Sequence, residues 1–356
     1  MNKLGINQKT LANLRTVAIA IVAAFLVSLV FIAALGADPI AAYIKMFTGV
    51  FGKKSGIFEV LAKATPLIIM GLGVSIAARG GLSNLGGDGQ FYVGAICAVC
   101  VGLYLPATLP APLIWVLAII VAIIAGGIWG GLAGWLKARF NTNEVIITIM
   151  LNYVGLYIVS WLVSGPLEAP GGIPQTLALP EQYYLPKLMT GSRAHWGILL
   201  AFVLAVAVKF LFKKTTVGYR IEAVGSAPNA ATYGGINQKF YGVLILFISG
   251  AFCGVAGMIE VYGTYYRVLE GITSSFGFTA MLIALLGKLD PYAVILGSLF
   301  ISVLTVGANS MQIAMNVPTS IVNVIQSLII VFVLIMPGVE KNIRDYRDKK
   351  RVGKGA

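Results

Sequence analysis

Charged side chains are scarce in this sequence. Asp, Glu, Lys and Arg make up 11% of its 356 residues, against about 25% in a soluble globular chain. So few charges cannot cover a water-facing surface, which excludes an ordinary soluble domain. Apolar residues reach 58%. The composition therefore indicates an integral membrane protein whose surface largely faces lipid.

Side chains that catalyse reactions or bind metals are also few. There are one histidine and three cysteines, whereas a membrane-embedded enzyme would need such groups clustered. Cys97 and Cys100 form a C-x-x-C inside an apolar span, and we interpret them as packing residues. His195 lies at the outer edge of an expected span, where a surface or helix-capping role is favoured. No G-K-[ST] follows the glycine-rich stretch 84–90, so neither a P-loop nor a cofactor is expected.

Long stretches without charge set the number of helices. Residues 16–37, 91–136 and 291–339 contain no charge, and one crossing takes about 20 apolar residues. Each of the two longer runs therefore holds two helices, and we interpret the first run as a span and not a signal peptide. We predict an all-α integral membrane protein with about ten transmembrane helices, at 16–36, 60–78, 90–105, 113–136, 146–164, 196–212, 241–261, a short 276–287, 291–308 and 319–337.

The distribution of Lys and Arg predicts the orientation. With a cytoplasmic N-terminus and every span crossing, nineteen of the 26 basic residues lie inside and seven outside. Residues 1–15 and the basic tail 338–356 are then both cytoplasmic, on either side of a transmembrane domain at 16–337, and the tail contacts anionic lipid headgroups. Because the basic residues lie at span ends and not in one patch, the net charge of +13 reflects topology, and no nucleic-acid partner is expected.

The longest cytoplasmic segment between spans, residues 215–240, has more pattern than a simple link. One helical turn is expected at 221–224 and another at 229–233, with Pro228 at a first helical position and glycines ending the second turn. A short helix at the membrane surface is suited to docking a partner protein. From the residues alone, a plain amphipathic connector remains the alternative.

This segment resembles the coupling loop of bacterial ABC importer permeases, because residues 218–236 read G-Y-R-x-x-A-V-G-x-x-P-x-A-A-x-Y-x-G-I. Stretches at 84–95, 143–153 and 276–291 are similar to signatures of the branched-chain amino acid, ribose and nucleoside permease superfamily. The four ordered motifs cover about 65–336, and E-V-I-x-T-I-M-L-N-Y favours the nucleoside-type branch. Asp88 departs from the glutamate usual in the family: it keeps the charge but shortens the reach.

The resemblance implies a type II ABC importer-like permease in the bacterial plasma membrane, with an inverted pair of helix groups and a cytoplasmic coupling helix. Its implied partners are ABC ATPase subunits that hydrolyse the ATP, a second permease that is related or identical, and an extracytoplasmic solute-binding lipoprotein. The expected solute is neutral and polar, most of all a nucleoside, with simple sugars and branched-chain amino acids as alternatives. ATPase coupling is expected from Arg220, Glu222, Ala223, Val224, Gly225, Pro228, Ala230, Ala231, Tyr233, Gly234 and Ile236.

Polar residues inside the spans have two interpretations. Amides are costly in lipid, so they either clamp helices together or line a pathway, and the resemblance favours the pathway. The glycine-rich turn around Asp88 is either a hinge at the inner gate or a tight turn with a solvated carboxylate. The predicted pathway and gate comprise Asn84, Asp88, Gln90, Thr148, Asn152, Asn323 and Gln326.

Small residues and the remaining charges complete the prediction. G-x-x-x-G steps predict close helix packing in two spans, at Gly126, Gly130 and Gly134 and at Gly250 and Gly254. Glu260 lies near a span end, where it is expected to reach water. A secondary transporter needs ionisable residues within the membrane, so charges at span ends make that class the less favoured alternative.

Overall fold

The computed structural model describes residues 8–34, 36–106, 108–273, 275–321, 323–329, 331–332 and 335. The chain divides into two compact units. One contains residues 1–56 and 303–356, and the other contains residues 57–302. The larger unit carries most of the residues that the sequence singles out.

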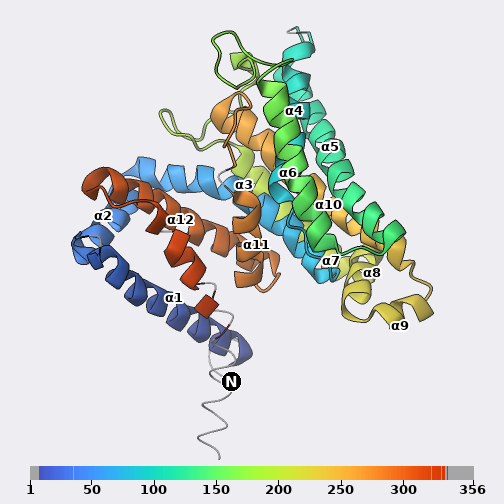
Figure 1. The fold of residues 1–356 in the computed structure, drawn as a ribbon, viewed down its shortest axis with the longest axis horizontal. Coiled ribbons are helices and arrows are strands. Elements are labelled where there is room, and N and C mark those ends of the chain that lie inside the picture. Colours follow the sequence, from blue (N-terminus) through green and yellow to red (C-terminus); the bar gives the residue numbers. More distant parts are fainter. Residues whose placement is uncertain are drawn as a thin grey trace, which may run out of the picture. The chain divides into compact units, whose positions relative to one another are not determined.

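The larger unit is a bundle of long helices. Four of them, α4 (Gly87–Tyr104), α5 (Ala111–Phe140), α6 (Glu144–Val163) and α10 (Gln238–Glu260), lie side by side, with α10 against both α4 and α5 (Figure 1). The unit also contains most of α3 (Lys54–Arg79), with α7 (Gly197–Lys214), the short α11 (Phe276–Leu286) and the first half of α12 (Pro291–Met315).

Glycines bring α5 and α10 into backbone contact. A Cβ on Gly250 would lie 2.3 Å from the Gly126 carbonyl oxygen, and one on Gly254 would lie 2.3 Å from the Ala122 carbonyl oxygen. On the facing helix, a Cβ on Gly130 would lie 2.3 Å from the Leu246 carbonyl oxygen. The predicted close packing is confirmed, and the two G-x-x-x-G spans are each other's partners.

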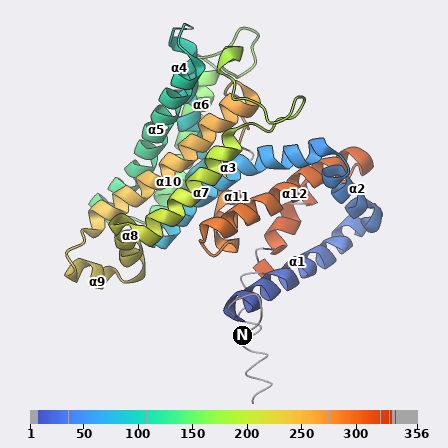
Figure 2. The ribbon, with the colours of Figure 1, turned by 180° about the vertical axis from the view of Figure 1, so that it is seen from behind.

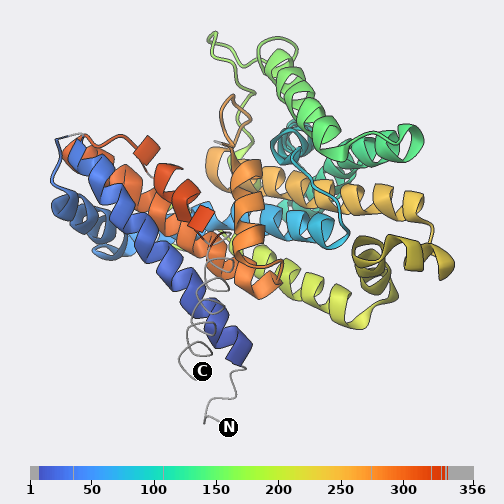
Figure 3. The same ribbon diagram turned by 60° about the horizontal axis from the view of Figure 1, so that its bottom comes forward.

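Two short helices lie at one end of this bundle. Helices α8 (Thr216–Ser226) and α9 (Pro228–Tyr233) follow the end of α7 and precede the start of α10 (Figure 2). With the bottom of the molecule turned forward, they form a pair between the end of α7 and the start of α10 (Figure 3). After α10 the chain continues in a π-helical turn, η2 (Val261–Tyr265). The loop after α6 bridges the chain after η2, at Gln175 and Leu269.

The smaller unit contains a helix that the sequence analysis missed. Helix α2 (Pro39–Phe51) follows α1 (Gln8–Ala34), and the Asp38 side chain caps it by accepting hydrogen bonds from the backbone N–H groups of Ile40 and Ala41. It packs closely on the second half of α12, because a Cβ on Gly307 would lie 2.4 Å from the Met46 side chain.

The first nine expected spans coincide with helices to within a few residues at their ends, and the tenth, 319–337, lies partly outside the described residues. Within the described part of the chain, five helices are long and apolar enough to cross a membrane: Lys54–Arg79, Ala111–Phe140, Glu144–Val163, Gln238–Tyr265 and Pro291–Met315. A bent pair, Ile21–Ala34 with Pro39–Phe51, gives a sixth if it is one span. Large apolar side chains on α5 and α6, among them Ile128 and Trp161, are exposed, as a lipid-facing surface requires. The full number of ten crossings stays a prediction.

The glycine contact between α5 and α10 gives a first testable prediction. Gly250→Ala should destabilise the protein by about 1–3 kcal/mol, because the added methyl meets the Gly126 carbonyl and forces the helices apart. Gly242→Ala, on the same helix, is the matched control, since a Cβ there has nothing within 4 Å. It should be neutral or stabilise by up to about 1 kcal/mol. Thermal unfolding in detergent measures both, and equal melting temperatures for the two variants would contradict the contact.

Candidate functional site

The segment 215–240 folds as two helices instead of two single turns. Helix α8 has 11 residues and α9 has six. Thr215 caps α8 by accepting a hydrogen bond of 3.1 Å from the Gly218 N–H, and Pro228 begins α9. Gly235 ends the second helix with a φ of 78°, which favours glycine. The expected start and stop residues are confirmed, and α8 is longer than expected.

The two helices enclose a groove of about 410 Å³. Small side chains predominate in its lining, which consists of Tyr219, Glu222, Ala223, Ser226, Ala227, Ala230, Ala231, Gly234 and Ile236. Tyr233, at the end of α9, is 93% exposed. A concave surface with an exposed aromatic ring beside it has the features of a protein-docking site.

The predicted coupling residues differ in exposure. Val224 and Ala231 are buried within the chain. Half-buried positions are Glu222, Ala223, Gly225 and Ile236, and exposed positions are Arg220, Pro228, Ala230, Tyr233 and Gly234. The residues therefore form two layers, of which the inner one holds α8 and α9 on the bundle and the outer one is accessible to a partner.

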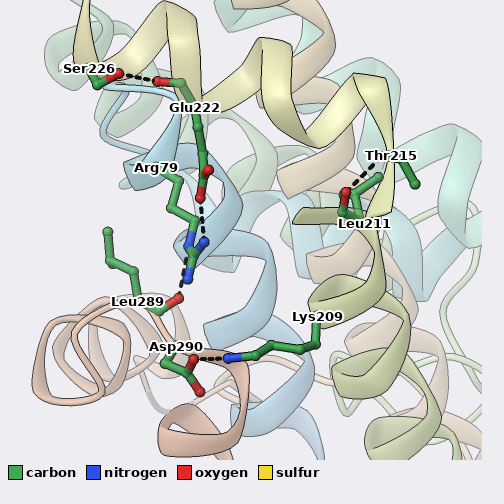
Figure 4. A network of polar contacts seen from close by, with 8 residues as sticks. All are labelled: Arg79, Lys209, Leu211, Thr215, Glu222, Ser226, Leu289 and Asp290. Atoms are coloured by element: carbon green, nitrogen blue, oxygen red, sulfur yellow. Dashed lines mark hydrogen bonds and ion pairs between the residues drawn. The ribbon is translucent and has the colours of Figure 1, made fainter. Parts of the chain in front are cut away.

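The inner layer packs against the end of α3. A Cβ on Gly225 would lie 2.1 Å from the Arg79 carbonyl oxygen, so α8 and α3 meet backbone to backbone. Next to this contact, Arg79 Nη1 lies 2.5 Å from Glu222 Oε1 (Figure 4). Arg220, also on α8, donates a hydrogen bond of 3.2 Å to the Tyr241 hydroxyl of α10. Helix α8 is thus tied to two helices of the bundle.

A break in regular structure between α3 and α4 explains one group of polar residues. Residues 82–86 are irregular, and their backbone groups need partners where water is excluded. The Asn84 Oδ1 accepts from the Gly86 N–H at 3.0 Å, and Thr148 Oγ1 accepts from the Leu85 N–H at 3.2 Å. Asn84 also donates to Gln90 Oε1 at 2.8 Å. These buried side chains hold the irregular segment in place.

Asn152 has the same role one turn further along α6. Its Oδ1 accepts a hydrogen bond of 2.6 Å from the Gly89 N–H in the first turn of α4. A Cβ on Gly89 would lie 2.8 Å from the Asn152 Cα, so the two helices are in close contact here. Thr148 and Asn152 share a face of α6, and that face is turned toward α4.

Asp88 belongs to the interior of the bundle. It is 5% exposed, which rules out the alternative of a solvated carboxylate. Its Oδ1 accepts a hydrogen bond of 2.8 Å from the Gly277 N–H in the first turn of α11. A Cβ on Gly277 would lie 2.8 Å from the Asp88 backbone nitrogen. Because the two backbones are this close, an aspartate reaches the N–H group and the shorter side chain is sufficient.

The two amides near the C-terminus differ in their surroundings. Gln326 is 9% exposed, and its Nε2 lies 3.4 Å from Thr305 Oγ1. Asn323 is exposed. Both lie in the smaller unit, whereas Asn84, Gln90 and Asn152 lie in the larger one. The predicted pathway residues therefore belong to two different units of the chain.

Sequence reasoning missed a group of buried polar atoms near the end of α10. Glu260 is 1% exposed, so the expectation that it reaches water is wrong. Its Oε2, the His195 Nε2 and the Thr264 hydroxyl have no hydrogen-bond partner among the described residues. The Nζ atom of Lys63, on α3, lies 5.7 Å from the centroid of the Phe276 ring and 6.0 Å from the centroid of the Tyr265 ring. Glu260 lies close to an expected span end, and nothing in the sequence there indicates that its side chain is buried.

His195 caps a helix, as one of the two expectations had it. It is 1% exposed, so the surface alternative is wrong. Its Nδ1 accepts a hydrogen bond of 3.1 Å from the Gly197 N–H at the start of α7. Burial lowers the pKa of the imidazole to about 4, which leaves it neutral and able to accept this bond at physiological pH.

The contact between Asn152 and Gly89 gives a second prediction. Asn152→Ala should lower the free energy of unfolding by about 1–3 kcal/mol, because it leaves the buried Gly89 N–H without an acceptor. Asn323→Ala is the control, since that amide is exposed, and it should change stability by no more than about 0.5 kcal/mol. The melting temperature of each purified variant measures the effect. If Asn152→Ala is as stable as Asn323→Ala, the α4–α6 clamp is wrong.

Comparison with known proteins identifies the family. Residues 56–334 match the family described as branched-chain amino acid transport system, permease component. A guanosine ABC transporter permease of Bacillus subtilis is 35% identical over 338 residues, covering 91% of this chain and 94% of the relative. A glucose ABC transporter permease of Haloferax volcanii is 33% identical over 332 residues, covering 90% and 86%. A nucleoside ABC transporter permease of Lactococcus lactis is 31% identical over 327 residues, covering 89% of each. This membrane-embedded chain therefore belongs to the permease components of ABC transport systems, in the branched-chain amino acid transport permease family.

Proposed function

We propose that this permease forms the translocation pathway of an ATP-driven importer of nucleosides. The observation that carries the proposal is the similarity, over about nine-tenths of the chain, to relatives named for guanosine and nucleoside transport. Sugar import is the second candidate, because a glucose permease is 33% identical over a similar length. Branched-chain amino acids are the third candidate, because the matching family is described by their transport.

The groove between α8 and α9 is the proposed docking site for the ATPase. The permease has no P-loop in its sequence, so ATP hydrolysis belongs to partner subunits. A groove of about 410 Å³ lined by alanine, glycine and serine fits an inserted side chain or helix end from a partner. Glu222, which lines the groove, adds a charged group that sets the orientation of the partner.

The remaining assembly follows from the same proposal. Two ATPase subunits act on two permeases, related or identical, and an extracytoplasmic binding protein delivers the solute. The permease lies in the bacterial plasma membrane with both termini in the cytoplasm. The excess of basic residues on the proposed inner side supports this orientation.

The solute pathway is proposed to be uncharged. Asn323 and Gln326 remain its candidate lining residues, since amides hydrogen-bond neutral hydroxyl and base groups. Asn84, Gln90, Thr148 and Asn152 are hydrogen-bonded to one another or to backbone. We therefore assign these four to the support of the pathway wall, with Asp88 holding α11 at the gate.

Uptake by the reconstituted importer tests the solute. The permease, its ATPase, its partner permease and its binding protein are placed in liposomes, and ATP-dependent accumulation of labelled guanosine, glucose and leucine is measured. Guanosine should accumulate, and other nucleosides should compete with it while glucose and leucine do not. Preferential uptake of glucose would select the sugar alternative. Accumulation of none of the three would refute the proposed function.

Substitutions in the groove test the docking site. Ala230→Glu places a carboxylate in the groove, where a docked ATPase would bury it unpaired at a cost of several kcal/mol. The ATPase should no longer co-purify, and uptake should be lost while the permease still folds. Asn229→Glu is the matched control: it lies next to Ala230 on α9, is also exposed, and does not line the groove. Ala231 is unsuitable because it is buried within the chain. Retention of the ATPase by Ala230→Glu would show that the groove is not the docking site.

A further inference from the structure

One arginine joins three parts of the larger unit. Arg79, the last residue of α3, forms the ion pair of 2.5 Å with Glu222 of α8. Its Nε donates a hydrogen bond of 3.0 Å to the carbonyl of Leu289, in the turn between α11 and α12. Its guanidinium also lies 4.5 Å from the centroid of the Phe212 ring on α7. Figure 4 shows the side chain between Glu222 and the Leu289 carbonyl.

The turn that receives Arg79 has an unusual backbone. Lys288 and Leu289 are consecutive non-glycine residues with φ values of 48° and 61°. A left-handed conformation is unfavourable for such side chains, by roughly 1–2 kcal/mol per residue, and it persists only where the surroundings hold it. The holding contacts here are the Arg79 hydrogen bond and an ion pair between Lys209 and Asp290 (Figure 4).

Helix α11 is held at both ends by one short segment of chain. Its first turn is bound through Gly277 to Asp88, and the turn after it is bound through Leu289 to Arg79. With 11 residues, α11 is about 16 Å long. The segment from Arg79 to Asp88, which contains the irregular run 82–86, therefore connects the two ends of α11.

The other end of this connection lies in the groove. Glu222 lines the groove and also pairs with Arg79. A partner that fills or leaves the groove therefore touches the same carboxylate that holds Arg79. The backbone contact of Gly225 with Arg79 adds a second, steric link between α8 and the end of α3.

We infer that Arg79 is a positioning residue that transmits movement of α8 to the α11–α12 turn, and so couples the ATPase to the gate. This inference rests on the proposed function. When the ATPase displaces α8, Glu222 and Gly225 move the end of α3, and Arg79 moves the Leu289 carbonyl with it. The strained turn and α11 follow, because Arg79 and Asp88 hold them at both ends.

Lysine cannot replace arginine in this role. The guanidinium uses two different nitrogens for Glu222 and Leu289 while its face lies on the Phe212 ring, which a single ammonium group cannot do. Arg79→Lys therefore keeps the charge and loses the simultaneous contacts. The ion pair itself is partly exposed, with 46% of the Glu222 side chain accessible, so its contribution to stability is small. Loss of transmission is then separable from loss of folding.

The test uses the complete importer in liposomes and measures solute transported per ATP hydrolysed. Arg79→Lys should retain the ATPase and hydrolyse ATP, while the transport ratio falls at least about fivefold, the low end of typical couplings between distant sites. Phe212→Leu, which removes the ring against the guanidinium and does not line the groove, should retain the ATPase and also lower the ratio. The double variant should be no worse than Arg79→Lys alone, because both changes break one connection. Phe212→Leu also serves if Arg79→Lys does not fold, since it leaves Arg79 paired with Glu222 and Leu289.

Lys137→Gln is the matched control. It removes an ion pair of the same length, 2.5 Å, between Lys137 of α5 and Glu144 of α6, which does not involve α8. Its transport ratio should equal that of the unmodified protein. If Arg79→Lys or Phe212→Leu transports with the normal ratio, the inferred role of Arg79 is wrong while the proposed function stands. If the unmodified complex neither binds the ATPase nor transports, the proposed function and this inference both fail.

Discussion

The need to satisfy backbone N–H groups away from water determines the centre of the larger unit. Between α3 and α4 the helix is interrupted, and irregular backbone inside a membrane protein is tolerated only where other groups supply its hydrogen bonds. Asn84, Thr148 and Asn152 supply them, and Asp88 extends the pattern to the first turn of α11. The interruption, the polar side chains and the placement of α11 are thus one arrangement, and each part requires the others.

The same arrangement changes the argument about transporter class. In the sequence, charges at span ends count against a secondary transporter, yet Glu260 and Asp88 are both buried. Buried ionisable groups therefore do not separate the two classes here. Family membership separates them, because the match covers residues 56–334 and relatives that are 33% and 35% identical are ABC transporter permeases. Asp88 has a structural partner in Gly277, so its burial is explained without ion coupling.

Local patterns in the sequence predicted local features well. Hydropathy predicted the helices at the first nine expected spans, and the glycine spacings predicted close packing in α5 and α10. Proline and glycine marked the bounds of α9. Helix α2 was missed because Lys45 interrupts its apolar pattern and 13 residues are too few for a span. The length of α8 was underestimated because it depends on burial of Ile221 and Val224 against other helices.

Contacts between distant residues could not be predicted from one sequence. Arg79 and Glu222 are 143 positions apart, and Arg79 and Leu289 are 210 apart. Periodicity reports which face of a helix is apolar, but it does not report which other element that face meets. The burial of Glu260 and the inward face of Asn152 depend on the same missing information. The resemblance to a family suggested the proposed role of the α8–α9 segment, and only the structure supplied its attachment to α3.

A weak ion pair suits a connection that must change during a transport cycle. A buried, fully desolvated pair resists separation, because breaking it leaves an uncompensated charge. The pair between Arg79 and Glu222 is partly exposed on both sides, at 21% and 46%, so water can replace either partner at little cost. The Lys288–Leu289 turn at the other side of Arg79 has a left-handed backbone conformation that its side chains disfavour, so it too depends on the contacts that hold it. A connection made of one exchangeable ion pair and one strained turn can therefore move between two arrangements without disturbing the glycine-packed α5–α10 core.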